Sequence, residues 1–291
     1  MIKIKVKNAN RIIIYIVLIF ASILILLPVY WMLKGSFSTL ESLYRQPPEI
    51  WPVNPTIDNY KFLLGFFPED ATQYGISTDL FPRSILNSLV VTIVATIVGI
   101  FLCSITGFAF AKYRFKGKDV LFFAILGMIM IPQVAIFIPN YILMAKLKLI
   151  NTYWALILPN VAHPFGIFWM RQYISRSIPD SVIESARIDG CNEFSIYTRI
   201  ILPIIRPGLG ALAIFLFLLK WNDLILPLAY TTKNEMFTFP LVLNILRQYQ
   251  YGNPLNLLMA GSIISIIPIL ITFLVAQKQF VAGITLGAVK E

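Results

Sequence analysis

The stretch IIIYIVLIFASILILLPVYWML, residues Ile12–Leu33, contains no charged side chain. A helix rises about 1.5 Å per residue, so a run of this length matches the roughly 30 Å hydrocarbon core of a bilayer. Four basic residues precede it, Lys3, Lys5, Lys7 and Arg11. Signal peptides share that layout, but this run is longer than their usual apolar region and no A-x-A cleavage site follows. We therefore predict an uncleaved first transmembrane helix.

Five further apolar runs set the class of the protein. They are Ile85–Ala111, Val120–Tyr141, Tyr153–Met170, Leu209–Tyr230 and Leu257–Ala276. Hydrophobic residues make up 58% of the 291 residues and charged residues 13%, whereas soluble domains have about 45–50% and about 25%. The sequence therefore predicts an all-α integral membrane protein with six transmembrane helices. The net charge is +10, but the basic residues lie in short tracts between the runs, which argues against nucleic-acid binding.

Prolines interrupt the third and fourth runs. Pro132 and Pro139 lie in the third, and Pro159 and Pro164 lie in the fourth. A proline inside a helix removes a backbone hydrogen bond and kinks the helix. Such breaks are tolerated at membrane depth only where neighbouring groups or a cavity satisfy the freed carbonyls. The pattern favours a translocation path over a simple membrane anchor.

Charge in the connecting segments predicts the orientation. With the N-terminus inside, the inner segments contain 15 lysines and arginines and the outer segments contain eight. Because cytoplasmic loops carry the excess of basic residues, both termini are predicted to be cytoplasmic. This topology divides the chain into an N-terminal tail (1–11), the first transmembrane helix (12–33), an extracytoplasmic loop (34–84), a transmembrane core (85–280) with a cytoplasmic loop at 171–208, and a C-terminal tail (281–291).

The cytoplasmic loop predicts two short helices around a glycine turn. Ser177, with Pro179 close behind, suggests a helix start, and Ser181 three residues before Glu184 could add a capping box. Gly190 can supply the positive φ that ends a helix.

A second short helix is expected from Asn192 to Ile201, ending before Pro203. Phe194, Tyr197 and Ile201 recur at helical spacing, which places them on one face. Apolar side chains on such a cytoplasmic loop are typical of a docking surface. The alternative is a hairpin that lies on the bilayer with its apolar face among the headgroups.

The fifth run contains two charged residues at membrane depth. Lys220 and Asp223 are three residues apart and so share a helix face. Ionisable residues in a span indicate a pathway or a paired structural contact. They could pair with each other, or line a polar route together with Trp221 and Asn222. Trp221 and Tyr230 are candidate stacking surfaces for a sugar ring.

Metal, disulfide and nucleotide chemistry is not expected on this chain. Cys103 lies in an apolar run and Cys191 in a polar loop, a poor match for a disulfide. His163 has no carboxylate or thiol neighbours in sequence, so we expect a hydrogen-bonded residue inside a helix bundle rather than a metal ligand. No G-x-x-x-x-G-K-[ST] stretch occurs, so the usual phosphate-binding loop is missing.

The cytoplasmic loop resembles the EAA loop of binding-protein-dependent ABC importer permeases. The residues that carry the resemblance are Glu184-Ser185-Ala186, Asp189-Gly190, Ile200, Leu202-Pro203 and Pro207. Ser185 and Cys191 depart from the family pattern, in which alanine is common, but both are small.

Other stretches resemble the carbohydrate-uptake branch of this family, of the maltose type. They are Asn87-Ser88, the segment from Tyr113 to Lys118, Trp221-Asn222-Asp223, Pro227-Leu228, and the tail from Gly283 to Lys290. The likeness runs from about the second span to the C-terminus. It implies the six-helix architecture of a type I ABC importer permease with a cytoplasmic coupling helix.

The resemblance implies roles for particular residues. The EAA helix of such permeases inserts into a cleft of the ATP-binding subunit, and the matching coupling residues here are Glu184, Ser185, Ala186, Asp189, Gly190, Leu202 and Pro203. The C-terminal tail reaches the ATPase interface in maltose-type importers, which implies that role for Gly283, Thr285, Gly287 and Lys290. The outer loop Thr231–Asn256 would probe the sugar-binding protein.

By this resemblance the chain is a non-catalytic permease subunit of a sugar importer in a prokaryotic cell membrane. Its implied partners are a second permease, two ATP-binding subunits that carry ATP and Mg²⁺, an extracytoplasmic sugar-binding protein, and the lipid bilayer. A permease for polyamines, phosphate or glycerol phosphate is the alternative, although Lys220 is the one basic residue well inside a span. An ion-coupled secondary transporter would usually show inverted repeats and several buried carboxylates, and the sequence shows neither.

Overall fold

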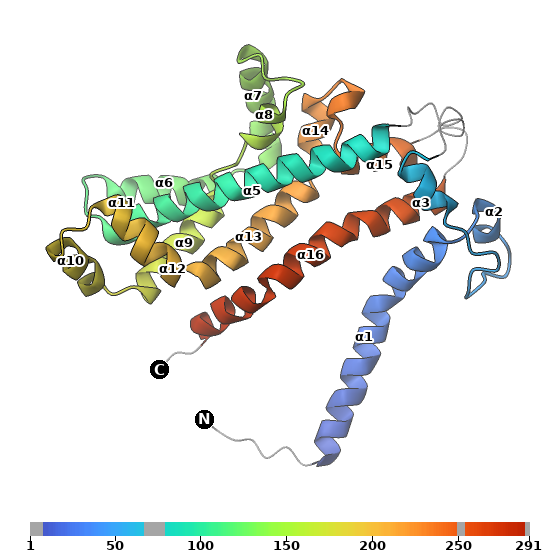
Figure 1. The fold of residues 1–291 in the computed structure, drawn as a ribbon, viewed down its shortest axis with the longest axis horizontal. Coiled ribbons are helices and arrows are strands. Elements are labelled where there is room, and N and C mark those ends of the chain that lie inside the picture. Colours follow the sequence, from blue (N-terminus) through green and yellow to red (C-terminus); the bar gives the residue numbers. More distant parts are fainter. Residues whose placement is uncertain (1–7, 67–78, 249–253, 289–291) are drawn as a thin grey trace. The chain divides into compact units, whose positions relative to one another are not determined.

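The computed structural model describes residues 8–66, 79–248 and 254–288, and the regular structure within these ranges is helical (Figure 1). This confirms the all-α prediction for the described residues. The chain divides into two units, residues 1–79 with 243–266, and residues 80–242 with 267–291. Two helices, α15 (Phe239–Arg247) and α16 (Leu255–Ala288), contribute to both units.

The first unit is built around the end of the first span. Its helices are α1 (Asn8–Ser36), α2 (Leu40–Leu43) and α3 (Asp58–Leu63), with the start of α16. Asn59 in α3 donates to the carbonyls of Ser36 and Ser38 at 2.8 and 2.9 Å. Its side-chain oxygen accepts from Asn256 in α16 at 2.7 Å. One asparagine therefore ties the segment after α1 to the last long helix.

The second unit carries the remaining helices. They are α5 (Leu80–Lys112), α6 (Lys118–Met130), α7 (Gln133–Lys146), α8 (Tyr153–Ile157), α9 (Pro164–Ser177), α10 (Asp180–Ile188), α11 (Glu193–Ser195), the π-helix η1 (Ile196–Ile201), α12 (Leu202–Ile204), α13 (Arg206–Trp221), α14 (Ile225–Tyr230) and the 3₁₀-helix η2 (Asn234–Met236). Helix α5 packs along α9 and α13 and is the central helix of this unit (Figure 1).

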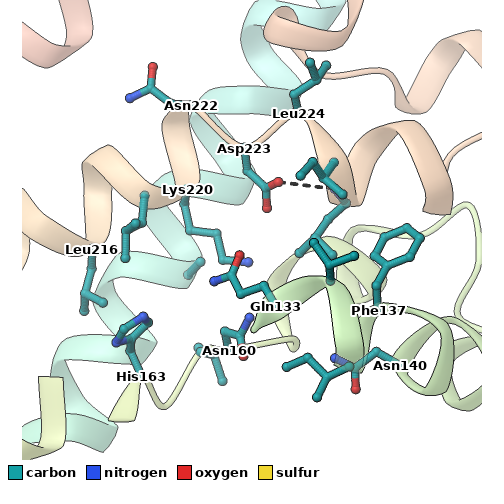
Figure 2. Close-up of a pocket in the computed structure, with 17 residues that line it drawn as sticks. Gln133, Phe137, Asn140, Asn160, His163, Leu216, Lys220, Asn222, Asp223 and Leu224 are labelled. Carbon is teal, nitrogen blue, oxygen red and sulfur yellow. Dashed lines mark hydrogen bonds between the residues drawn. The ribbon is translucent and has the colours of Figure 1, made fainter. Parts of the chain in front are cut away.

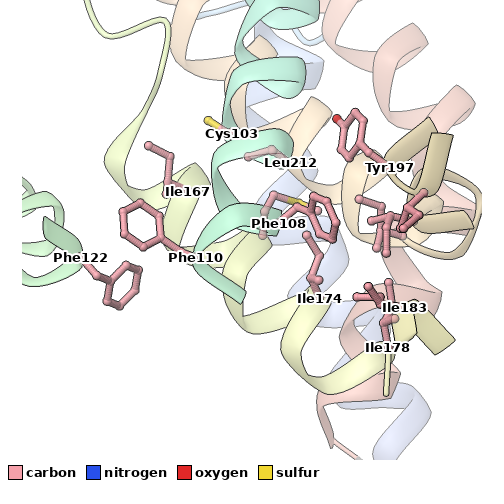
Figure 3. Close-up of a cluster of buried hydrophobic side chains, with 14 of the residues drawn as sticks. Cys103, Phe108, Phe110, Phe122, Ile167, Ile174, Ile178, Ile183, Tyr197 and Leu212 are labelled. Carbon is pink, nitrogen blue, oxygen red and sulfur yellow. The ribbon is translucent and has the colours of Figure 1, made fainter. Parts of the chain in front are cut away.

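Small residues let α5 and α9 approach closely. A Cβ on Gly107 would lie 2.7 Å from Cβ of Met170, and one on Gly166 would lie 2.8 Å from Sγ of Cys103. Such small residues at a helix interface are a common packing device of membrane proteins, because the backbones can then touch. The core of the unit continues from this interface into the hairpin of residues 180–204, which was predicted to be cytoplasmic, and Tyr197 of this hairpin belongs to the same buried cluster (Figure 3).

The apolar runs predicted as spans form helices, but some of these helices are bent or broken. Three described helices are long and apolar enough to cross a bilayer, at Arg11–Ser36, Leu80–Lys112 and Leu255–Gln277. The pair α6 and α7 is bent by 104°, and the segment Glu193–Ile204 meets α13 at 81°, so up to five spans result if each bent pair counts as one. The fourth predicted run is split between α8 and α9. Six spans therefore stay a prediction.

The prolines account for most of the breaks. Pro132 lies between α6 and α7, Pro159 lies between α8 and α9, and Pro164 begins α9. Proline fits the first position of a helix because the N–H it lacks has no partner there. Pro139 does not end α7, which runs through it, because an interior proline removes one hydrogen bond and leaves the others.

Candidate functional site

Helix α10 begins at Asp180, directly after Pro179, and no side chain caps its first turn. The predicted capping box is therefore wrong, because Ser181 lies inside the helix rather than at its N-cap. The start of α10 is instead held by Lys112 at the end of α5. The Lys112 ammonium donates to the Ile178 carbonyl and to Oδ1 of Asp180, the latter at 2.6 Å.

Gly190 ends α10 as predicted, with φ of +80°. The Gly190 N–H donates to the Arg187 carbonyl at 3.1 Å, and the Cys191 N–H donates to the Ala186 carbonyl at 3.0 Å. This pair of bonds is the Schellman pattern, which needs a left-handed residue that glycine supplies without steric cost. A Cβ at Gly190 would meet no atom within 4 Å. The requirement for glycine is thus one of backbone conformation and not of space.

The second half of the hairpin begins at Asn192, whose side chain accepts from the Ser195 N–H at 2.8 Å. It was predicted to end before Pro203, which is wrong, since α12 includes Pro203. The preceding turn is a π-helix in which the Leu202 N–H bonds to the Tyr197 carbonyl. The extra residue in that wider turn shifts the hydrogen-bond register, so the missing N–H of Pro203 is accommodated.

Burial divides the predicted coupling residues into two groups. Ala186 lies in the core with Ile183, Tyr197 and Ile201, and Leu202 packs against that core. The exposed members are Glu184, Ser185, Asp189, Gly190 and Pro203. The predicted common face of Phe194, Tyr197 and Ile201 is split, because Phe194 is 67% exposed while the other two are buried.

An apolar side chain that the sequence did not single out stands at the tip of α10. Ile188 is 86% exposed, and it lies directly before Asp189 and Gly190. The helix behind it is buried through Ile183 at 3% exposure. The hairpin therefore presents an exposed apolar tip on a base that is packed into the core.

Charged side chains brace the two halves of the hairpin. Arg187 in α10 donates to Glu193 in α11 at 2.8 Å, and the Tyr113 hydroxyl, after α5, donates to the same carboxylate. These bonds, first from Arg187 and then from Tyr113, hold the pKa of Glu193 below its usual value. Burial, with the Glu193 contact, raises the pKa of Tyr113 to about 12.

A cavity of about 710 Å³ lies where the helix breaks of the second unit meet (Figure 2). Its lining includes Gln133 after the α6–α7 break, Asn160 and His163 in the α8–α9 break, and Asn222 and Asp223 in the α13–α14 break. The structure thus brings together three breaks that are separated in sequence. This agrees with the expectation that broken helices at membrane depth surround a cavity.

The two charged residues of the fifth run bond to backbone groups. The Lys220 ammonium donates to the carbonyls of Leu156 and Pro159, at 2.9 and 3.1 Å. Oδ1 of Asp223 accepts from the Leu226 N–H at 3.2 Å, at the start of α14. Lys220 therefore satisfies carbonyls freed by the α8–α9 break, and Asp223 stabilises the turn after α13.

The aromatic residues predicted to stack on substrate are placed elsewhere. Trp221 is 1% exposed and stacks on Phe217, with ring centroids 5.9 Å apart. Tyr230 is fully buried and stacks on Phe137, with centroids 6.2 Å apart. Of the four predicted path residues, Asn222 and Asp223 line the cavity and the two aromatics do not. His163, predicted to be hydrogen-bonded, has no partner for its buried Nδ1 among the described residues.

The predicted tail lies at the end of the described chain. Gly283, Thr285 and Gly287 fall within the backbone of α16, and their side chains lie outside the described part of the structure. Lys290 lies outside the described residues altogether. The loop Thr231–Asn256, predicted to be on the outer side, is described apart from residues 249–253.

Comparison with known proteins decides the family. The family described as "binding-protein-dependent transport system inner membrane component" matches residues 99–285, which include α9, the hairpin and the cavity-lining breaks. The chain belongs to this family. It is therefore a membrane component of a transport system, and the resemblance found in the sequence is confirmed.

Relatives match the permease over most of its length. The arabinooligosaccharides transport system permease protein AraQ of Halalkalibacterium halodurans is 38% identical over 82% of this chain and 81% of its own. The AraQ protein of Bacillus subtilis is 35% identical over 92% of both chains. The lactose transport system permease protein LacG of Rhizobium radiobacter is 31% identical over 95% of both.

A solved structure shows the same fold. A chain of a bacterial ABC transporter involved in the import of the acidic polysaccharide alginate superposes on the permease with a TM-score of 0.80. The match covers 94% of this chain and 99% of that one, at 21% sequence identity. The permease therefore has the fold of an ABC importer membrane subunit.

Several site residues of the permease were missed from the sequence. Lys112 and Tyr113 brace the hairpin, and Gln133 and Asn160 line the cavity. A signal for the last two was present, because each is a polar residue directly after a proline in an apolar run. No local pattern could have paired Lys112 with Asp180, which lies 68 residues further along the chain.

We expect the hairpin of the permease to loosen only in strongly acidic solution. Hydrogen bonds hold the pKa values of Asp180 and Glu193 below their usual range. Carboxyl groups of this kind stabilise the fold above their unfolded pKa of about 4, and the stabilisation is lost as the pH falls through the lower, folded value. Hydrogen exchange of residues 180–195, corrected for intrinsic rates, is therefore expected to stay constant down to about pH 5 and rise below about pH 4.

The variant Glu193→Gln serves as the control for this measurement. It removes the carboxylate to which Arg187 and Tyr113 donate, so hydrogen exchange of the hairpin should be faster in this variant already at neutral pH. Faster exchange in the unaltered permease between neutral pH and about pH 6 would contradict the role given to these carboxylates.

Proposed function

We propose that this chain is a transmembrane subunit of an ABC sugar importer, that it forms half of the translocation path, and that it couples to separate ATP-binding subunits. The observation that carries the proposal is the cytoplasmic hairpin, with an exposed tip at Ile188 and a base buried at Ile183. Because the base of the hairpin is packed into the core, a partner that pushes on the tip would also move the helices behind it, as coupling by rigid-body motion requires. A hairpin that lay on the bilayer surface would not need a base packed into the helical core.

The substrate class follows from the relatives and from the cavity. The relatives are permeases of arabinooligosaccharide, trehalose and lactose systems. Carboxamide side chains of Gln133, Asn140, Asn160 and Asn222 line the cavity, and such neutral groups suit hydroxyl-rich ligands. Two of the three donors of Lys220 are taken by backbone carbonyls, which leaves little cationic character for an anionic solute.

The remaining partners complete the proposal. A second permease, two ATP-binding subunits with ATP and Mg²⁺, and an extracytoplasmic sugar-binding protein would assemble with this chain. The exposed coupling residues would contact the ATP-binding subunits, and the tail from Gly283 to Lys290 would lie near them. The excess of basic residues in the inner segments supports a multi-pass topology in the cell membrane with both termini and the hairpin in the cytoplasm.

Affinity purification from native membranes tests the proposal. We expect the chain to bring down an ATP-binding subunit and a second permease, identified by mass spectrometry. Scrambling residues 184–190 should remove the ATP-binding subunit and retain the second permease. A matched charge reversal at an exposed site on the other predicted side, Lys233→Glu, should lose neither. Recovery of the chain alone in every case would refute the proposal and favour a solitary transporter.

A further inference from the structure

We propose that the cavity at the helix breaks is a subsite for neutral oligosaccharide on this subunit, in which Gln133, Asn140 and Asn160 bond to sugar hydroxyls. The inference rests on the proposed function and goes beyond it, because it assigns recognition to this chain. Sequence pattern alone pointed to Trp221 and Tyr230, which the structure places outside the cavity.

The polar side chains of the cavity come from helix α7 and from the α8–α9 break. Gln133, Phe137 and Asn140 recur at helical spacing along α7, so they share one face, and all three line the cavity. Asn160 faces them from the α8–α9 break, where its backbone adopts a φ of +60°. Asparagine tolerates this left-handed conformation better than most residues. The breaks thus direct polar side chains toward the cavity (Figure 2).

These amides are not engaged by the protein. Among the described residues, the side chains of Gln133, Asn140 and Asn160 make no hydrogen bond. Much of the surrounding wall is apolar, including Val134, Leu216 and Leu219. Asn140 is half-buried, and Gln133 and Asn160 are exposed at the cavity surface. Each amide offers donors and an acceptor, so all three are open to a ligand in the cavity. A ligand rich in hydroxyl groups satisfies both the donors and the acceptors.

The charged residues of the cavity wall also bear on which ligand fits. Lys220 and Asp223 also line the cavity, but both are bonded to backbone groups of the breaks. These two residues carry opposite charges, and the other polar groups of the lining are neutral amides and the imidazole of His163. The volume of about 710 Å³ falls within the range of small-molecule sites. Size and charge together favour one or two units of a neutral sugar chain.

Uptake by the complete importer in cells tests this subsite. The variants Gln133→Leu and Asn160→Gly remove an amide, and glycine keeps the positive φ at position 160. The probes are radiolabelled arabinotriose, trehalose, lactose and maltotriose. For the sugars that the unaltered importer moves, each variant is expected to lower uptake at limiting sugar by about tenfold, as the loss of roughly one hydrogen bond to a ligand predicts. The ratio between sugars should change as well.

Controls separate recognition from folding and from coupling. Gln172→Leu removes an amide outside the cavity and should leave uptake unchanged, and Gln133→Asn should restore part of it. Stimulation of the ATPase by the sugar-loaded binding protein should persist in the cavity variants, because the hairpin is intact. Unaltered uptake and ratios in Gln133→Leu and Asn160→Gly would overturn the subsite while leaving the proposed function standing. If the unaltered chain brings down no ATP-binding subunit and no second permease, the proposed function fails and the subsite with it.

Discussion

Replacing Ile188 by aspartate is expected to abolish sugar uptake while the amount of the protein in the membrane stays unchanged. Ile188 is 86% exposed at the tip of α10, so the substitution disturbs no packing within the chain. In the assembled importer this tip would be covered by an ATP-binding subunit, where an unpaired carboxylate is strongly unfavourable. Uptake of labelled sugar, with immunoblots of the membrane fraction, measures both quantities.

The same helix supplies a matched control on its buried side. Ile183 is 3% exposed within the core cluster, so Ile183→Asp should lower the amount of folded protein rather than uncouple it. Glu184→Lys, at an exposed position, should behave like Ile188→Asp. Normal uptake in both exposed variants would remove the coupling role from α10.

Lys220→Met is expected to give the largest loss of stability among substitutions in the cavity wall. The ammonium donates to the carbonyls of Leu156 and Pro159 across 64 and 61 residues of sequence. Methionine has a similar length but no donor, so two carbonyls at a helix break lose their partner. Each lost bond costs about 1–2 kcal/mol at membrane depth. Thermal denaturation of the purified protein in detergent measures the change.

A second substitution tests whether the loss of stability comes from the unpaired Asp223 carboxylate or from the two backbone carbonyls that lose their donor. Asp223 also lines the cavity. Adding Asp223→Asn to Lys220→Met should recover part of the stability if the uncompensated carboxylate contributes, and none if only the carbonyls matter. Lys146→Met, at an exposed position near the end of α7, should have no effect. An unchanged melting temperature for Lys220→Met would show that these two bonds do not hold the break.

Local chemistry made much of the hairpin predictable. Gly190 follows a helical stretch and can adopt a left-handed conformation, so the turn could be located from the sequence. The capping box and the predicted end before Pro203 were wrong. Both depended on hydrogen bonds that the sequence pattern does not show. Lys112 of α5 holds the start of α10, and a local π turn carries the chain through Pro203.

The candidate site was predictable only in part. The apolar runs and their prolines indicated broken helices around a path, because membrane thickness and a missing N–H act on a few residues at a time. The lining was not predictable, because it depends on which breaks meet. In the sequence Gln133 and Asn160 are isolated polar residues within apolar runs and were not singled out, and Trp221, predicted to stack on a sugar, is buried.

The sequence by itself determined the membrane class, the places where helices break, and the glycine turn of the hairpin. Each of these follows from hydropathy or from the backbone limits of one residue. Tertiary structure alone decided that three breaks line one cavity, that Lys220 bonds to carbonyls of another segment, and that Ile188 stays exposed while Ile183 is buried. The physical reason is that the freed carbonyls and amides of a broken helix find partners in space, and those partners lie tens of residues away along the chain.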